Sequence, residues 1–386
     1  MSYKPQSAST LFLIPIEIRR DIYANLLGNG HIHITLLSSK AGFRLTRCSD
    51  PDLGAEHVGD KRRPAGDDPD NRIWARRLSS TWGPHWQCEE SSLAKEEETK
   101  DKDDAVIPSS YFEILDVMRE QVCFHITDLD TIGTLFQYLS ASPATSGSLG
   151  FEGLVAPHIQ KLEVALSLPL AFFEYFDDQP SAPGRELAPL FQEQARIWTE
   201  MPQGIDKLLP SLRKLSIWLD HTQRPYWSVL HERAVLRPFE QLGNLSRLDL
   251  SFDLPMLRSG VGGATHLFLE EEDTGGCHFN NPSPTPIYIR RRLRQRQRVV
   301  NAGAGIGRAP TIRWCPDFPL GLKFSVNDGL SVAEMALRER AMERQGINVE
   351  QELVMSIFPD LYIPALLGMI FGRPDPLKDH GHLCLE

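Results

Sequence analysis

The chain has 386 residues, of which 41% are hydrophobic and 24% are charged, and its formal net charge is -10 at pH 7. This length favours two domains, or one elongated domain with linkers, and the apolar fraction is sufficient for a substantial core. The acidic balance argues against general affinity for nucleic acid, because phosphate binding depends on Lys and Arg side chains that release counterions.

The cysteines and the apolar runs indicate a chain that stays in a reducing compartment and out of the membrane. Six cysteines lie far apart with no Cys-x-x-Cys pair, which is not a disulfide framework. No secretory signal pattern opens the chain, and the longest apolar run, 361–371, is too short to span a bilayer. We therefore expect a cytoplasmic or nuclear protein, and the sequence leaves its oligomeric state open.

The first predicted element is a short helix within residues 11–27. Pro15 stands near the first helical position, Glu17 suits the helix dipole, and Gly28 follows the expected end. One stripe of this helix is apolar, so that face needs a partner. Either the stripe docks on the chain's own core, or it contacts another protein through the side chains of Ile18, Ile22, Tyr23, Leu26 and Leu27.

The spelling of this stretch, Leu-x-x-x-Pro-x-Glu-Ile-Arg-x-x-Ile-Tyr-x-x-Leu-Leu, resembles the F-box-like segments of a large group of fungal proteins of uncharacterised function. The resemblance covers about the first tenth of the chain, and the second helix usual in that group, of the type Leu-Leu-x-x-Cys-Arg, is absent here. In F-box proteins this segment binds the adaptor of a cullin-RING ubiquitin ligase. The resemblance therefore implies an adaptor as partner, contacted by Pro15, Ile18, Ile22, Tyr23, Leu26 and Leu27.

A strand and then a polar segment follow the helix. Residues 31–36 alternate polar and apolar side chains, which predicts a half-buried strand. Residues 49–108 contain Asp-Pro and Arg-Arg-Pro sequences, which interrupt regular structure, and a dense mixed-charge run. This composition favours a partly disordered linker around one helix at 71–78. Three tryptophans in this segment indicate local docking on the folded part: Trp74, Trp82 and Trp86.

A leucine pattern then recurs three times. Residues 159–164, 212–217 and 245–250 each follow Leu-x-x-Leu-x-Leu, with Ile or Val in place of some Leu, as in the strand half of a leucine-rich repeat. Helices are predicted between them at 186–201 and 226–242, and an earlier strand and helix at 124–126 and 130–139. The order favours parallel strands with right-handed crossovers. Because the spacing is uneven, we expect an irregular leucine-rich-like array, and an ordinary α/β domain remains the alternative.

A Gly-, Pro- and Asn-rich insertion is predicted near 255–286, with an acidic run at 270–273. An arginine-rich run follows it and precedes a last strand at 320–326. The run fits a solvated face paired with the acidic insertion, a nuclear import signal, or a nucleic-acid contact. The residues concerned are Arg290, Arg291, Arg292, Arg294, Arg296 and Arg298.

The C-terminal part is predicted to be helical. Ser331 and Glu334 form a capping box, Gly346 is a suitable stop, and a second helix is expected over 348–357. Two such helices can cover the end of an array that would otherwise expose apolar surface.

Sequence motifs for catalysis, cofactor binding or metal binding are weak along the whole chain. Residues 299–307 contain three glycines, but Arg308 occupies the position where a dinucleotide-binding fingerprint needs its last glycine. His85-x-x-Cys88 has no matching second pair nearby, and His380-x-His382-x-Cys384 stands at the end of the chain. We therefore predict no catalytic residue, no cofactor and no metal site, although distant residues could still assemble an enzyme.

The sequence as a whole predicts an α/β chain in four parts: an F-box-like segment at 1–48, a linker at 49–108, an irregular leucine-rich-like domain at 109–330, and a helical cap and tail at 331–386. The expected function is non-enzymatic protein–protein interaction, with recruitment of an unknown target protein to a ubiquitin ligase. The alternative is a stand-alone scaffold with no ligase role.

Overall fold

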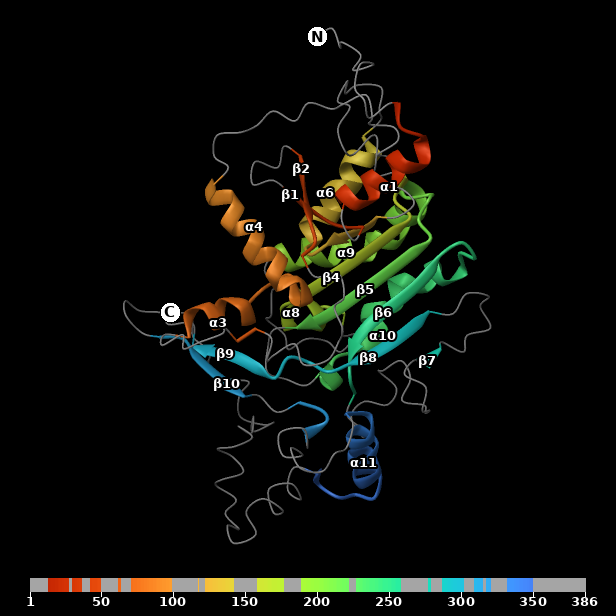
Figure 1. Cartoon of the computed structure of the whole chain (residues 1–386). Coiled ribbons are helices and arrows are strands. Elements are labelled where there is room, and N and C mark those ends of the chain that lie inside the picture. Colours follow the sequence, from red (N-terminus) through yellow and green to blue (C-terminus); the bar gives the residue numbers. More distant parts are fainter. Residues whose placement is uncertain are drawn as a thin grey trace.

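A computed structural model of the chain describes the segments that carry the fold (Figure 1). Described residues are 13–27, 30–36, 42–49, 62–63, 71–98, 117, 122–141, 158–176, 189–221, 227–257, 277–278, 287–301, 309–314, 317–320 and 332–349. The predicted strand at 320–326, most of the insertion at 255–286 and the helix at 348–357 lie almost entirely outside this part.

The centre of the fold is an eight-stranded, mostly parallel sheet with the strand order β2-β1-β3-β4-β5-β6-β8-β7. Only the outermost pairs, β1 with β2 and β7 with β8, are antiparallel in it. In Figure 1 the strands lie side by side from β1 and β2 at one edge to β8 and β7 at the other. The bounds are β1 His31–Leu36, β2 Phe43–Arg47, β3 Cys123–Ile126, β4 Lys161–Leu168, β5 Lys214–His221, β6 Asp249–Pro255, β7 Cys277–His278 and β8 Tyr288–Arg292.

Helices connect the parallel strands, as the alternating pattern predicts. They are α6 Leu129–Ser140, α8 Leu170–Glu174, α9 Pro189–Leu208, α10 Glu232–Leu236, and the 3-10 segments η4 Trp227–Val229 and η5 Arg237–Asn244. Helix α6 begins where the Asp128 carboxylate accepts a hydrogen bond from the Thr131 N–H. The single helix expected over 226–242 is instead three short turns, because Pro238 cannot donate the backbone hydrogen bond of a continuous helix.

The sheet has an apolar face that packs against these helices. Strand residues such as Phe124, Val164 and Ile217 share one hydrophobic cluster with Trp198 of α9 and Phe239 of η5. Each of these five side chains is fully buried. One core therefore extends beneath the strands from β1 to β8 and fixes their order.

The opposite face of the sheet is polar, because neighbouring residues of a strand point to opposite sides. Lateral pairing aligns its side chains in rows across the strands. One row contains His33, His125 and Glu163, and another contains Trp218 with Asp253. The histidine and carboxylate side chains of the sheet therefore lie on that face.

The leucine pattern locates the strands but not their full extent. The strands begin two to four residues after each motif does and continue beyond it, ending at Leu168, His221 and Pro255. The first two motifs pair in phase, with Leu162 opposite Leu215, whereas Leu215 lies opposite Leu250 and not opposite Leu248. The third motif is thus displaced by two residues, and the fold shown is mixed α/β with a mostly parallel sheet.

The structure differs from the linker expected over 49–108. Within it, helices α3 Arg72–Leu78 and α4 Trp86–Glu98 flank the turn η2 Gly83–His85. Ala75, Leu78 and Trp86 are buried, as the clustered tryptophans indicated, and η2 contacts β4. The apolar anchors thus outweigh the polar composition, and this segment covers part of the polar face.

Four further elements complete the described chain, and the first of them is helix α1 Ile16–Leu27. Strands β9 Gln297–Asn301 and β10 Thr311–Trp314 form a separate antiparallel pair. Helix α11 Val332–Arg344 is followed two residues later by Gly346, whose φ of 76° suits a glycine after a helix. No helix in the described segments combines the length and apolar character that crossing a bilayer requires.

Candidate functional site

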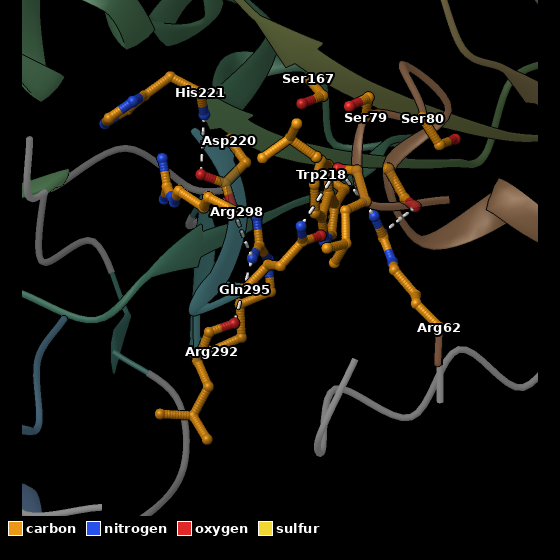
Figure 2. Close-up of a pocket in the computed structure, with 14 residues that line it drawn as sticks. Arg62, Ser79, Ser80, Ser167, Trp218, Asp220, His221, Arg292, Gln295 and Arg298 are labelled. Carbon is orange, nitrogen blue, oxygen red and sulfur yellow. Dashed lines mark hydrogen bonds and ion pairs between the residues drawn. The ribbon is translucent and has the colours of Figure 1, made fainter. Parts of the chain in front are cut away.

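A pocket of about 300 Å³ opens on the polar face, near the carboxyl ends of the parallel strands (Figure 2). Ser167 comes from the end of β4, Asp220 and His221 from the end of β5, and Arg292 from the end of β8. Crevices outside the carboxyl ends of strands are the usual ligand sites of open α/β sheets. The remaining lining residues are Arg62, Leu78, Ser79, Ser80, Gly83, Trp218, Leu293, Gln295, Arg298 and Val299.

Asp220 organises the charged side of the pocket. Its carboxylate accepts hydrogen bonds from Arg292 at 3.2 Å and from Arg294 at 2.8 Å, and Arg294 also pairs with Asp317 at 2.9 Å. All four side chains are buried. Burial alone would raise the pKa of the Asp220 carboxyl, but Arg294 and Arg292 outweigh it and hold that pKa well below its usual range.

The indole of Trp218 forms the floor between the two sides of the pocket. The Arg292 guanidinium lies 3.9 Å from the centre of the Trp218 ring, which is a close cation–π contact. On the other side, η2 approaches Trp218 so closely that a Cβ at Gly83 would stand 2.7 Å from the ring. Glycine is therefore required at this point of the wall.

Arg62 is a buried cation whose hydrogen bonds in the described part of the chain go to carbonyl oxygens. It donates to Arg77 O at 2.8 Å and to the Gly83 carbonyl from Nη2. Burial lowers the pKa of the Arg62 guanidinium to about 10, although Asp220 and Glu89 act in the opposite direction. An anionic group in the pocket would favour the charged form of Arg62.

The arginine-rich run does not form the solvated face that the sequence suggests. Arg292, Arg294, Arg296 and Arg298 are buried, and Arg291 pairs with the fully buried Glu232 at 2.8 Å. Arg290 is half exposed and forms an ion pair with Asp253. The acidic residues 270–273 lie outside the described residues. Burial of four arginines argues against their use as an import signal.

In the N-terminal helix, α1 Ile16–Leu27, some of the predicted partner-binding side chains are exposed and one is buried. Ile18 is 49% exposed and Pro15 is also exposed, whereas Ile22 is half-buried. Tyr23 is only 3% exposed, so it anchors the helix to the chain. Ile16 adds a neighbouring apolar side chain that is 48% exposed. The side chains of Leu26 and Leu27 lie outside the described part.

Histidine and cysteine side chains that could hold a metal also gather on the polar face. Among the described residues they form three groups: His33, Cys48, His85 and Cys88; His31, Cys123 and His125; and His85, His125 and Glu163. His85 of the first group lies two residues after Gly83, in the same turn η2 that forms the pocket wall.

Sequence reasoning missed the pocket, although it carries a recognisable signal. Asp220 and His221 directly follow the apolar alternation of β5, at the carboxyl end of a predicted parallel strand. That position is where an open α/β sheet places polar ligand-binding groups. Arg62 carries no such signal, because its burial depends on the packing of η2.

Comparisons with known proteins place most of the chain in one family. The model of a family described as Domain of unknown function (DUF7730) matches residues 4–261. No curated protein and no solved structure matches the chain.

Proposed function

The chain belongs to the DUF7730 family, a domain of unknown function, and from this premise we propose that it is a non-enzymatic protein–protein interaction module. In this proposal it recruits substrates to a cullin-RING ubiquitin ligase. Helix α1 contacts the ligase adaptor, and the polar face of the leucine-rich-like sheet contacts the target protein.

The observation that carries this proposal is the exposure of apolar side chains at the start of α1. Ile16 and Ile18 are 48% and 49% exposed, and Leu13 just before the helix is 83% exposed. Tyr23 is buried one turn further on and holds the helix in place. Covering a large apolar side chain contributes about 1.5–3 kcal/mol, so this end of α1 favours docking on a partner.

The electrostatics of the pocket support binding in preference to catalysis. A general acid or base is most effective when its pKa lies near the working pH. Arg294 and Arg292 hold the pKa of Asp220 far below that range, and its carboxylate oxygens are engaged with those two guanidinium groups. Asp220 therefore suits a structural role in a binding surface.

An adaptor pull-down tests the proposal. The full-length chain should retain the ligase adaptor, and Ile18→Asp should reduce retention at least tenfold, because the charge would be buried at the interface. Leu337→Asp is the matched control, since Leu337 also lies on a helix and is 49% exposed. No retention by the unaltered chain, or equal loss from both variants, would overturn the proposal.

The burial of Tyr23 favours one alternative, a stand-alone scaffold in which α1 is structural and has no ligase role. A scaffold of that kind predicts that Ile18→Asp leaves every protein co-purified with the chain unchanged. The same pull-down, read by mass spectrometry of the retained proteins, separates the two functions.

A second candidate function is the binding of an anionic group in the pocket. Arg62, Arg292 and Arg298 line the pocket, whereas Asp220 is the carboxylate among its described lining residues. The pocket thus carries excess positive charge beside the serines Ser79, Ser80 and Ser167. A phosphate or a carboxylate, free or on a target protein, fits this chemistry.

Inorganic phosphate can serve as the probe for this second candidate. Phosphate at constant ionic strength should raise the thermal midpoint of the chain, and Arg62→Gln should abolish the shift. Arg247→Gln, at a surface pair with Asp206, should leave the shift intact. A midpoint independent of phosphate, or the same response in both variants, would reject the pocket as an anion site.

A further inference from the structure

Four buried side chains from three separate parts of the chain converge beside the edge of the sheet. His33 lies in β1, Cys48 directly follows β2, His85 ends the turn η2, and Cys88 lies in the first turn of α4. Their exposed fractions are 0%, 5%, 1% and 4%. One ligand atom from each lies within 4.8 Å of all the others.

Local structure explains why each donor faces the same point. His33 is on the polar face of β1, and the β1–β2 pairing together with a hydrogen bond from Cys48 N–H to the His31 carbonyl brings Cys48 beside it. His85 and Cys88 are three residues apart at the start of a helix, so their side chains share one face.

Two distances from Cys48 match those of a tetrahedral metal centre. The Cys48 Sγ atom is 3.6 Å from Cys88 Sγ and 3.6 Å from His85 Nδ1. Zinc bond lengths of about 2.3 Å to sulfur and about 2.0–2.1 Å to nitrogen place two such sulfurs about 3.8 Å apart, and sulfur and nitrogen about 3.6 Å apart. A disulfide bond, at about 2.05 Å, is excluded by the separation of the two sulfurs.

Hydrogen bonding among the described residues leaves ligand capacity unused in this cluster. Both ring nitrogens of His33 are buried without a hydrogen-bond partner among the described residues, which is a costly arrangement for polar groups. The Ser49 backbone N–H donates to Cys88 Sγ at 3.3 Å, and a hydrogen bond of this kind orients a metal-binding thiolate.

We propose that His33, Cys48, His85 and Cys88 bind a zinc ion in a closed, tetrahedral structural site. Two thiolates and two imidazoles with no open position are typical of structural zinc. The ion joins the β1–β2 hairpin to the η2–α4 segment and so holds the Gly83 wall of the pocket. This inference stands independently of the proposed function.

The sequence did not predict this site because its second pair is distant in the chain. His85-x-x-Cys88 is visible as half of a zinc motif, whereas His33 and Cys48 are fifteen residues apart on two strands. Only the antiparallel pairing of β1 with β2 brings those two residues together.

Metal analysis of the purified full-length chain, made without a metal-binding tag, is the direct test. We expect one zinc per chain, and X-ray absorption should show two sulfur and two nitrogen ligands at the bond lengths above. Cys48→Ser combined with Cys88→Ser should remove at least nine-tenths of the zinc. Cys123→Ser is the matched control, because Cys123 belongs to the neighbouring group with His31 and His125, and it should retain full zinc.

Several results would overturn the site. They are a zinc-free protein after growth in zinc-supplemented medium, a Cys48–Cys88 disulfide in the intact mass, full zinc in the double variant, or zinc lost from Cys123→Ser alone. If the double variant is insoluble, X-ray absorption of the unaltered chain decides the question, because a zinc ion without two sulfur ligands contradicts the assignment.

Discussion

The carboxylate of Asp220 pairs with two buried arginines, Arg292 and Arg294, and a second carboxylate, Asp317, completes the group. An arrangement of this kind is sensitive to the loss of one member, because the remaining charges stay buried without compensation. The free energy of desolvating the two arginines is lost on folding whether or not Asp220 is present. Removing Asp220 should therefore lower the stability of the chain by much more than the ion-pair group as a whole contributes to it.

Asp220→Asn should destabilise the chain by about 3–5 kcal/mol, as for other broken buried ion pairs. The matched control is Asp206→Asn, which breaks a surface pair with Arg247 whose side chains are 49% and 31% exposed. That change should cost no more than about 1 kcal/mol. Urea denaturation of both variants measures the difference, and equal midpoints would contradict the buried network.

The same carboxylate predicts a dependence on pH. Its pKa is lowered in the folded chain, so its contribution is present above the unfolded Asp pKa of about 3.9 and is lost as pH falls through the folded value. The stability difference between the unaltered chain and Asp220→Asn should therefore be constant from about pH 7 to about pH 4. Urea denaturation across this range checks it, and a difference that already shrinks by about pH 5 would refute the assignment.

At the scale of elements, the turn η2 links the pocket to the metal-binding cluster. Gly83 has a φ of 56° and contacts Trp218, its carbonyl accepts a hydrogen bond from Arg62, and His85 ends the same turn. Both the conformation and the close approach of this glycine are needed, because the indole leaves no space for a side chain.

Two glycine substitutions separate conformation from contact. Gly346 also has a positive φ, of 76°, but no atom lies within 4 Å of its would-be Cβ, so Gly346→Ala should cost about 1–2 kcal/mol for backbone strain alone. Gly83→Ala should cost more, because Trp218 must also move. Urea midpoints of the two variants test this order, and a smaller loss for Gly83→Ala would show that the ring is free to shift.

The elements that sequence predicts best are those with strong periodicity and caps. Helix α6, capped by Asp128, and helix α3 were located to within a residue or two, and the positive φ of Gly346 confirms the stop after α11. The ends of the strands are predicted less accurately, because the Leu-x-x-Leu-x-Leu pattern covers only the first part of each strand. Residues 226–242 look helical by composition, but proline at position 238 divides them.

For the whole molecule, one hydrophobic cluster includes residues from β1 to β8 and from every helix of the apolar face. Among the described residues, this cluster joins β1 of the expected N-terminal segment, 1–48, to the expected α/β domain, 109–330. These two parts should unfold together, because no strand can leave the sheet without exposing its neighbours.

Trp198→Ala tests that coupling, since Trp198 is fully buried in α9 and packs against Phe239. The substitution should cost about 3–5 kcal/mol and should lower the urea midpoint seen by circular dichroism and by the remaining tryptophans equally. Trp218, on the polar face, is the relevant reporter. An unchanged Trp218 transition would indicate two independently folding parts.

The fold class followed from the order of strand and helix patterns, whereas the sites did not. The pocket and the His–Cys cluster depend on which strands are neighbours and on how η2 covers the polar face, and both are tertiary facts. Arg292 and Arg294 illustrate the limit. A run of charges normally predicts solvent exposure, whereas the burial of these two depends on partners that the tertiary structure supplies, Asp220 for both and Asp317 for Arg294.

The two-residue displacement of the third leucine motif leaves both faces of the sheet intact. Side chains of a strand alternate with a period of two, so a slip by an even number exchanges one inward residue for another. A slip by one would have turned Asp253 toward the helices and Phe252 toward water. The turn before Leu245 can therefore gain or lose residues in pairs, and a single insertion there would invert the strand unless the turn itself absorbed it.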